Sequence, residues 1–361
     1  MSNDNISAEN FKDLLTEPRP YIDVRAPVEF ALGSLPGAVN LPILGNDERA
    51  LIGTTYKEQG REVAIKLGYQ LISGDVKAER VQAWAQFIKK NPHAVIYCFR
   101  GGLRSQISQQ WLSEVGIHRP LIIGGYKAAR NFLMDTVLSF AKQHDMWLIS
   151  GATGSRKTKL IENIKQSCSA VDLEDLASHR GSAFGATEKK QPSQIDFENL
   201  LAVELLKVEP YMQNRKLLVE DESRLIGRNA IPALFFEKMR SSPVIWVEEP
   251  IEARVENIFQ DYILHSGRLK LELLASFKEA VKAISKKLGG LRSQEILSLI
   301  SAAEADYTQS GRLEANKLWI ERLLAYYYDP LYLQSIDKRQ VKIIFKGSRL
   351  DCEKYLINQK K

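Results

Sequence analysis

The 361-residue chain has few cysteines and no long apolar run. Its three cysteines, Cys98, Cys168 and Cys352, lie far apart and form no Cys-x-x-Cys pair, which argues against a disulfide framework and a zinc site. No apolar stretch reaches the roughly 18 residues that a membrane span needs. Residues 1–15 are polar where a signal peptide would be basic and then apolar, so we expect a cytoplasmic protein.

Positive charge is only slightly in excess, and the excess is unevenly distributed along the chain. The formal net charge is +6, and residues 251–361 hold 19 Lys and Arg against 14 Asp and Glu, which is five of those six charges. A basic surface favours nucleic acid as a partner. The excess is modest, so charge alone is equally typical of a solvated helical surface.

Short apolar strands alternate with helical stretches up to about residue 125, and the alternation restarts at residue 146. Such alternation predicts an α/β fold with a mostly parallel sheet. Beyond residue 250 the pattern is mainly helical. The strands that the pattern predicts cover residues 19–25, 93–98, 120–125, 146–150, 169–175, 216–223, 243–250 and 339–347, and residues 29–42 are predicted as helix, turn and strand.

The same pattern divides the chain into four parts. We predict an α/β domain over residues 1–126, a connecting helix over 127–144, a second α/β domain over 145–250, and a basic, mainly helical region over 251–361. No internal repeat or low-complexity tract interrupts this organisation.

A cysteine at the end of a predicted strand opens the first candidate site. Residues 98–105, CFRGGLRS, form a glycine loop that leads into a helix. The N–H groups of such a loop and helix would point at the sulfur and stabilise a nucleophilic thiolate. No such setting surrounds Cys168 or Cys352. The expected site residues are Cys98 as nucleophile, Arg100 and Arg104 as added positive charge, and Gly101, Gly102 and Ser105 around an oxyanion.

The second candidate site is a glycine loop at residues 151–158, GATGSRKT, which comes close to the G-x-x-x-x-G-K-[ST] phosphate loop. Arg156 stands where that pattern has its second glycine, so we expect crowding or an unfavourable backbone angle there, and ordinary ATP hydrolysis is put in doubt. Backbone N–H groups and a lysine would hold a diphosphate or polyphosphate. The residues expected to bind it are Gly151, Thr153, Gly154, Ser155, Lys157 and Thr158.

Two further groups of polar residues are candidates for the same phosphate site. Glu220, Asp221 and Glu222 follow a predicted strand, where Asp221 and Glu222 are the preferred candidates to hold magnesium, unless they form a solvated strand end. His179 and Arg180 lie beside glycine and serine in a predicted loop, and Arg180 is a candidate to bind phosphate or an RNA backbone.

Two families resemble the first part of the chain. Residues 21–42, YIDVRAPVEFALGSLPGAVNLP, resemble rhodanese, the sulfurtransferase fold. Cys98 is separated by five residues from Arg104-Ser105, which is similar to the phosphate-binding signature of cysteine phosphatases. Tyr97 stands where those phosphatases usually have a histidine. In either family we expect Asp23 and Arg25 to brace the fold and the loop, not to react.

Taken together, the motifs resemble the tRNA 2-selenouridine synthase family. The resemblance rests on YIDVRAP, GSLPGAVNLP, CFRGGLRS, the phosphate loop, HRGSAFG, VEDESRLIG and, near the end, YYYDPLY. It implies that the sulfur of a 2-thiouridine at the anticodon wobble position of tRNA is replaced by selenium from selenophosphate. It further implies an S-geranylated intermediate made from geranyl diphosphate. On those terms Cys98 acts in the selenium step, and residues 151–158 hold the diphosphate.

Three other functions fit parts of the pattern. An ATP-dependent RNA sulfurtransferase would release AMP or ADP and would need no prenyl donor. A cysteine phosphatase of rhodanese fold joined to a kinase-like domain would cleave an aryl phosphate. A binding module would use the basic C-terminal region on RNA without chemistry. The products formed on tRNA distinguish these alternatives from the selenium reaction.

Overall fold

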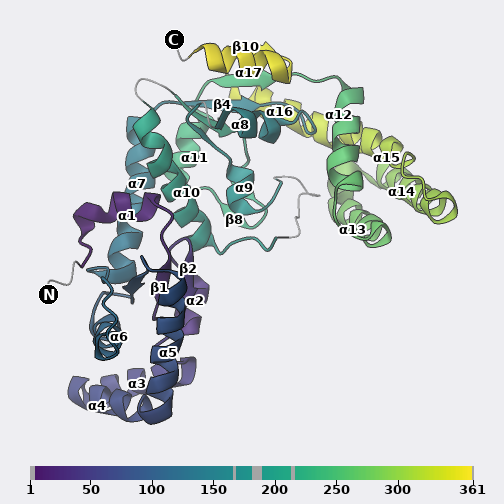
Figure 1. Cartoon of the computed structure of the whole chain (residues 1–361). Helices are drawn as coiled ribbons and strands as arrows, with labels where there is room; N and C mark the ends of the chain where they lie inside the picture. Colours follow the sequence, from purple (N-terminus) through teal and green to yellow (C-terminus); the bar gives the residue numbers. More distant parts are fainter. Residues whose placement is uncertain (1–4, 166–167, 181–188, 213–215, 360–361) are drawn as a thin grey trace. The chain divides into compact units, whose positions relative to one another are not determined.

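The computed structural model (Figure 1) describes residues 5–165, 168–180, 189–212 and 216–359. The chain divides into two compact units, each with its own parallel sheet and flanking helices, which confirms the predicted α/β fold class. Among the helices of these residues, none combines the length and the apolar character that crossing a membrane would require.

The first unit comprises Met1–Phe140 and Pro192–Lys207. Its sheet is parallel, with the strand order β2 (Ala38–Asn40), β1 (Tyr21–Asp23), β3 (Val95–Tyr97). Its main helices are α1 (Phe11–Thr16), α2 (Pro27–Leu32), α3 (Asn46–Gln59), α4 (Arg61–Leu71), α5 (Gly74–Lys90), α6 (Leu103–Glu114), α7 (Gly125–Gln143) and α10 (Gln194–Val208).

The core of the first unit forms around the strands, whose residues in β1 and β3 are all buried. Continuous burial on both faces explains why these segments read as apolar runs. Trp84 of α5 and Trp111 of α6 stack with their ring centroids 6.3 Å apart, and Cys98 belongs to the same hydrophobic cluster. The candidate nucleophile is therefore attached directly to the packed core.

Helix α10 belongs to the first unit, although the sequence pattern places it inside the second α/β domain. The Ser34 N–H donates to Asp196 Oδ1 at 2.8 Å, and Arg130 Nη1 donates to Asn199 Oδ1 at 2.6 Å. These polar contacts join residues far apart in the sequence, so no local pattern could assign the helix to its unit.

The second unit comprises Ala141–Gln191 and Val208–Lys361. Its parallel sheet has the strand order β10-β9-β4-β6-β5, and a small antiparallel hairpin, β7-β8, lies apart from it. The strands are β4 (Met146–Ser150), β5 (Ala170–Val171), β6 (Leu217–Glu220), β7 (Leu225–Ile226), β8 (Asn229–Ala230), β9 (Val244–Val247) and β10 (Ile343–Gly347). The helices against this sheet are α8 (Lys157–Lys165), α9 (Leu173–Ala177), α11 (Ala233–Arg240) and α17 (Arg349–Asn358).

The helical C-terminal part has a separate hydrophobic core that includes Phe259, Phe277 and Trp319. Beyond it the chain returns to the α/β layer, where β10 pairs with β9, as the predicted strand over 339–347 requires. The helices of this part are α12 (Ile251–Ile258) with a π-helical continuation (Phe259–Leu264), α13 (Lys270–Leu288), α14 (Gly290–Ser310), α15 (Asn316–Leu323) with a second π-helical segment (Leu324–Tyr328), and α16 (Asp329–Arg339).

Two of the predicted strands are almost absent from the structure. In the segment 120–125 only isolated bridges form, between Ile122 and Ile6 and between Leu121 and Ile96. The prediction over 169–175 fails after Val171, because the Asp172 side chain accepts a hydrogen bond from the Asp175 N–H and caps the start of α9.

Candidate functional site

The Cys98 sulfur lies at the carboxyl end of β3, where the first candidate site begins. The residue is 3 % exposed, and its Sγ is 3.2 Å from the hydroxyl of Ser105 in the first turn of α6. The Ser105 hydroxyl also donates to the Gly102 carbonyl oxygen at 3.0 Å. The structure thus brings the predicted cysteine, loop and helix start together around one sulfur atom.

Two glycines let this loop pack closely against the start of α7. Gly101 has φ +62° and Gly125 has φ +59°, and a Cβ on Gly125 would lie 2.4 Å from the Cys98 carbonyl oxygen. The Tyr126 N–H then donates to that carbonyl at 2.9 Å, and the Lys127 N–H donates to the Phe99 carbonyl at 2.9 Å. The first turn of α7 therefore fixes the backbone from which the cysteine extends.

The two arginines of the loop have different surroundings. Arg104 donates to both carboxylate oxygens of Glu29, at 2.6 and 3.1 Å, so much of its charge is neutralised within the unit. Burial acts to raise the pKa of Glu29, yet that pKa is lowered overall because Arg104 donates to the carboxylate. Arg100 is exposed, with its guanidinium 5.9 Å from the ring centroid of Phe99, and is available to an anion arriving from solvent.

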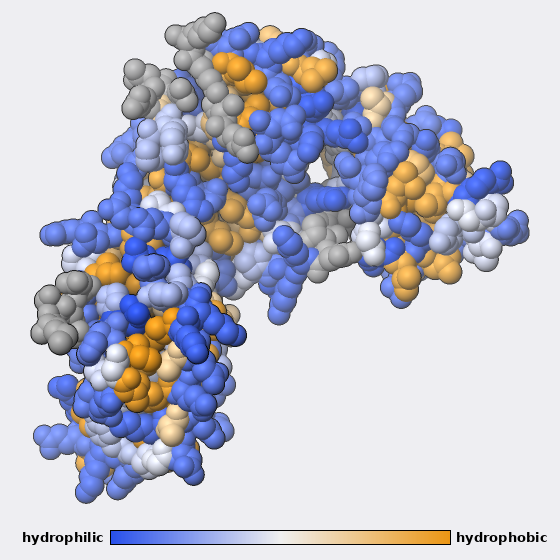
Figure 2. Space-filling model, viewed as in Figure 1, coloured by the Kyte–Doolittle hydropathy of each residue, from blue (hydrophilic) through white to orange (hydrophobic). Residues whose placement is uncertain are grey.

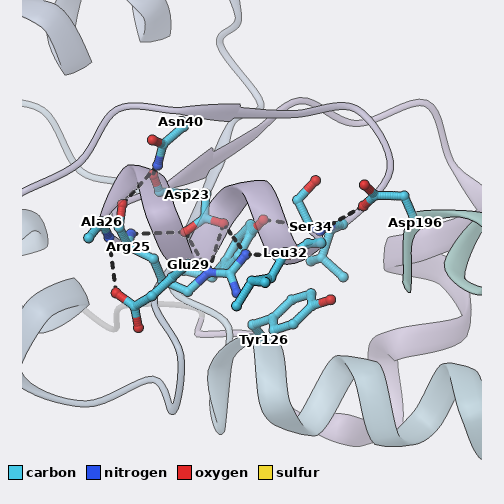
Figure 3. Close-up of polar contacts among 12 residues, drawn as sticks. Asp23, Arg25, Ala26, Glu29, Leu32, Ser34, Asn40, Tyr126 and Asp196 are labelled. Atoms are coloured by element: carbon cyan, nitrogen blue, oxygen red, sulfur yellow. Dashed lines mark hydrogen bonds and ion pairs between the residues drawn. The ribbon is translucent and has the colours of Figure 1, made fainter. Parts of the chain in front are cut away.

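Asp23 and Arg25, at and just beyond the end of β1, form a buried ion pair (Figure 3). Arg25 Nη2 donates to Asp23 Oδ2 at 2.6 Å and to the Gly33 carbonyl at 2.8 Å. Its guanidinium carbon lies 4.0 Å from the ring centroid of Tyr126, at the start of α7. These contacts join three segments of the unit, which matches the bracing role expected of this pair.

An apolar pocket of about 260 Å³ opens beside the cysteine loop. It lies between α3, α4 and α6, and its lining includes Ile52, Ile65, Leu103, Ile107 and Trp111. Arg104 is also part of the lining, so the pocket borders the loop itself. Figure 2 shows hydrophobic residues gathered on the surface of the first unit in the region of α6.

The phosphate loop of the second unit follows β4 and ends at α8, as the sequence predicts. Arg156 adopts φ +58°, the left-handed conformation in which the usual pattern has glycine. An unfavourable backbone angle is thus the consequence of this departure, at a cost of about 1–2 kcal/mol. Its guanidinium lies 3.9 Å from the Asp261 carboxylate, and both side chains are partly exposed.

Lys157 is held inside the loop, where its Nζ donates to the Gly151 carbonyl at 2.9 Å. Burial acts to lower the pKa of Lys157, but Tyr332 and Glu222 act in the opposite direction and the pKa is raised overall. The lysine is therefore charged at neutral pH, as binding of a phosphate requires.

The carboxylates after β6 divide between two tasks. The Thr158 hydroxyl lies 3.0 Å from both Glu220 and Glu174, whereas Asp221 is paired with Arg339 at 2.7 Å. Burial, and then repulsion by Glu174, raises the pKa of Glu220 well above its ordinary value. In the described part of the chain no cluster of three or more acidic, histidine or cysteine side chains is arranged to hold a metal ion. Asp221, which we expected to hold magnesium together with Glu222, is instead paired with Arg339.

The loop is supported from the C-terminal helices. Arg254 of α12 donates to both oxygens of Asp329, at 2.8 and 2.7 Å, and to the Thr153 carbonyl at 3.3 Å. The Tyr332 hydroxyl accepts from the Gly151 N–H and bonds to the Ser150 hydroxyl. Helix α16 is thereby fixed next to the loop at its first turn.

A pocket of about 800 Å³ lies between the loop and these helices. Such a volume is typical of small-molecule sites, which range over roughly 300–1,000 Å³. Of segment 178–185, residues 181–185 lie outside the described part. The pocket collects these predicted residues: Gly151, Thr153, Gly154, Lys157, Thr158, Arg180, Asp221 and Glu222. Ser155 is buried in the loop and is not part of the lining.

Tyr332, Arg339 and Arg240 also line this pocket and were not predicted as site residues. A signal for the first was present in the sequence, because Tyr332 is the last residue of YYYDPLY, whose aspartate is Asp329. No local pattern marks the two arginines, which come from α16 and α11.

Comparisons with known proteins bear on both units. The family described as tRNA 2-selenouridine synthase AAA domain matches residues 144–361, and the rhodanese-like domain matches residues 7–131. A tRNA 2-selenouridine synthase of Bdellovibrio bacteriovorus is 50 % identical over 99 % of this chain and 99 % of its own length. Its counterpart in Nitrosomonas eutropha is 51 % identical over 99 % of this chain and 98 % of its own length.

Among solved structures, the N-terminal domain of a putative ATP/GTP binding protein from Clostridium difficile 630 resembles part of the chain. It is 33 % identical with a TM-score of 0.31, and the match covers 36 % of this chain and 98 % of that domain.

Proposed function

Because the chain belongs to the tRNA 2-selenouridine synthase family, we propose that it replaces the sulfur of a 2-thiouridine at the tRNA wobble position by selenium. Geranyl diphosphate first alkylates the sulfur, and selenophosphate then supplies the selenium. The observation that carries this proposal is the presence, in one chain, of a loop built around Cys98 and of a cationic pocket at a phosphate loop.

The alkylation step belongs to the second unit. The sulfur of the base bonds to the first carbon of the geranyl group, the carbon–oxygen bond breaks, and diphosphate leaves. Negative charge accumulates on the departing diphosphate, so groups that stabilise it lower the barrier. Lys157 and the loop N–H groups are available for this, once Lys157 exchanges the Gly151 carbonyl for a phosphate oxygen.

The selenium step belongs to the first unit. Alkylation turns the sulfur into a good leaving group, so that the selenium of selenophosphate can bond to carbon 2 of the base while the carbon–sulfur bond breaks and geranyl thiol departs. Water then attacks the phosphorus, the selenium–phosphorus bond breaks, and phosphate leaves the selenated base. Selenophosphate is a tetrahedral anion, which suits a glycine loop at a helix start with Arg100 exposed beside it. Cys98 is the nucleophile that this unit offers for handling the selenium donor.

The apolar pocket beside Cys98 suits the ten-carbon tail of the alkylated base. Its volume of about 260 Å³ is small, and its walls are mainly aliphatic and aromatic side chains. Burying the tail there would hold the reacting carbon near the loop, because Leu103 and Arg104 belong to both the loop and the pocket lining. The geranyl group would then bind through hydrophobic contact during the exchange.

Mass spectrometry of tRNA nucleosides tests the whole proposal. The protein is incubated with 2-thiouridine-containing tRNA, geranyl diphosphate and selenophosphate, each alone and together. We expect geranylated uridine with the prenyl donor alone and selenouridine with both donors. Formation of neither product would overturn the proposal, and ATP-dependent thiolation or phosphate release from an aryl phosphate would favour the sulfurtransferase or the phosphatase.

A further inference from the structure

Helix α16 reaches the phosphate pocket at two points seven residues apart. Tyr332 contacts the beginning of the loop, and Arg339, the last residue of the helix, contacts Asp221 after β6. Residues at this spacing lie on one face of a helix, two turns apart. One face of α16 therefore borders both the phosphate loop and the carboxyl end of β6.

The guanidinium of Arg339 is buried and incompletely paired. Its side chain is 7 % exposed, and Nη1 donates to both oxygens of Asp221, at 2.7 and 2.9 Å. Within the described residues its Nε and Nη2 have no hydrogen-bond partner. Buried donors are nearly always paired in folded proteins, so this pair of nitrogens indicates a missing acceptor.

A second guanidinium faces the same corner of the pocket. Arg240 ends α11 and is part of the pocket lining together with Arg339. Burial, and then repulsion by Arg339, lowers the pKa of Arg240, while Asp221 acts in the opposite direction. Asp221, which is paired with Arg339, is thus the carboxylate that acts on both guanidinium groups. An additional anion would balance this corner.

We propose that Arg339 and Arg240 form a second phosphate subsite, so that the pocket binds both phosphates of a diphosphate. One phosphate lies on the loop N–H groups and Lys157, where Gly151 exchanges the Tyr332 oxygen for a phosphate oxygen. The other phosphate accepts from Arg339 Nε and Nη2 and from Arg240, which match its oxygens as paired donors. The inference rests on the proposed function in taking the diphosphate to be that of the prenyl donor.

Burial distinguishes this ligand from the phosphates of an RNA backbone. The unpaired nitrogens of Arg339 belong to a side chain that is only 7 % exposed. A nucleic-acid strand contacts cations that reach its surface, whereas a small diphosphate can enter a pocket of about 800 Å³. Arg339 and Arg240 thus add guanidinium donors to the pocket that the phosphate loop borders.

Calorimetric titration of the full chain with inorganic pyrophosphate, and separately with inorganic phosphate, tests the subsite. We expect Arg339→Gln and Arg240→Gln each to weaken pyrophosphate binding by about tenfold while changing phosphate binding by less than about threefold. Arg349→Gln is the matched control, because Arg349 lies on α17 and contacts Glu353 outside the pocket. Unchanged pyrophosphate affinity in both pocket variants would overturn the subsite.

Arg339→Gln also leaves Asp221 without its partner, so folding is checked by thermal unfolding without ligand. If that variant unfolds early, Arg240→Gln and the double variant Asp221→Asn, Arg339→Gln decide the matter by the same titrations. A wild-type protein that does not bind pyrophosphate overturns the subsite as well.

Geranyl transfer to tRNA is measured on the same preparations to keep the two proposals apart. Pyrophosphate binding that depends on both arginines, without geranylated product from the wild type, supports the subsite and defeats the proposed reaction. Geranylation by the wild type, with pyrophosphate affinity equal in all variants, defeats the subsite alone.

Discussion

The cysteine loop and the phosphate loop share a strand–glycine loop–helix backbone, but they surround different groups. Each follows a buried parallel strand, each has glycine at positive φ, and each ends at the first turn of a helix. In the first unit the centre is filled by the protein's own sulfur atom, since Cys98 is 3 % exposed. In the second the loop borders a pocket of about 800 Å³. The comparison shows one backbone arrangement that encloses a sulfur atom in the first unit and borders an open pocket in the second.

The cations of the two loops differ in what they contact. Arg104 forms an ion pair with Glu29 inside the first unit, so Glu29 largely neutralises its charge. Lys157 donates a hydrogen bond to a backbone carbonyl, and among the described residues Arg339 has two nitrogens without a partner. A neutralised arginine orients a loop, whereas an incompletely paired cation attracts a charged ligand.

The largest effect is expected from Cys98→Ala. Selenouridine formation should fall on the order of a thousandfold or more, because the nucleophile is removed. Geranylated uridine should still form and accumulate, since alkylation belongs to the other unit. Mass spectrometry of tRNA nucleosides measures both products, with Cys168→Ala as control. Normal selenium incorporation by the variant would contradict the role of Cys98.

Lys157→Ala should affect the other product first. Geranylation should fall on the order of a hundredfold or more, because the departing diphosphate loses a charged partner. Selenation of tRNA supplied in the geranylated form should continue. Lys282→Ala, on an exposed side chain paired with Glu279 and outside the pocket lining, is the control. Equal loss of both reactions would contradict the assignment of alkylation to the second unit and selenation to the first.

A smaller effect is expected from filling the apolar pocket. Ile65→Trp places a larger ring in the space proposed for the geranyl tail, and selenation of geranylated tRNA should slow by about tenfold. Val63→Trp lies on the same helix, is exposed, and is outside the pocket lining, so it should leave the rate unchanged. Similar rates for the two variants would place the tail elsewhere.

The smallest effect concerns pH. Burial, and then repulsion by Glu174, raises the pKa of Glu222 to about 8, so the side chain is neutral at pH 7. Above pH 8 it becomes negative in an anion pocket, and pyrophosphate affinity should fall by about threefold between pH 7 and 9. Titrations across this range measure the change. Glu222→Gln should show a flatter profile, and a steeper one would assign the change to another group.

Much of the architecture could be predicted from local pattern. The apolar strands at β1, β3, β4, β6, β9 and β10 and both glycine loops are confirmed. Helices α3 and α4 were not predicted, and α10 was predicted within the second α/β domain although it belongs to the first unit. In α10 the decisive contacts are polar ones to Ser34 and Arg130, which periodicity does not report.

The sequence by itself determined the strands, the two loops and the family, because strand burial, glycine conformations and motif spacing are all written within short segments. Tertiary structure decided which charges surround each loop. Glu29 meets Arg104 across 75 residues, and Tyr332 meets Gly151 across 181. Pairing and unpairing of buried charges depend on distances through space, and only the folded chain sets those distances.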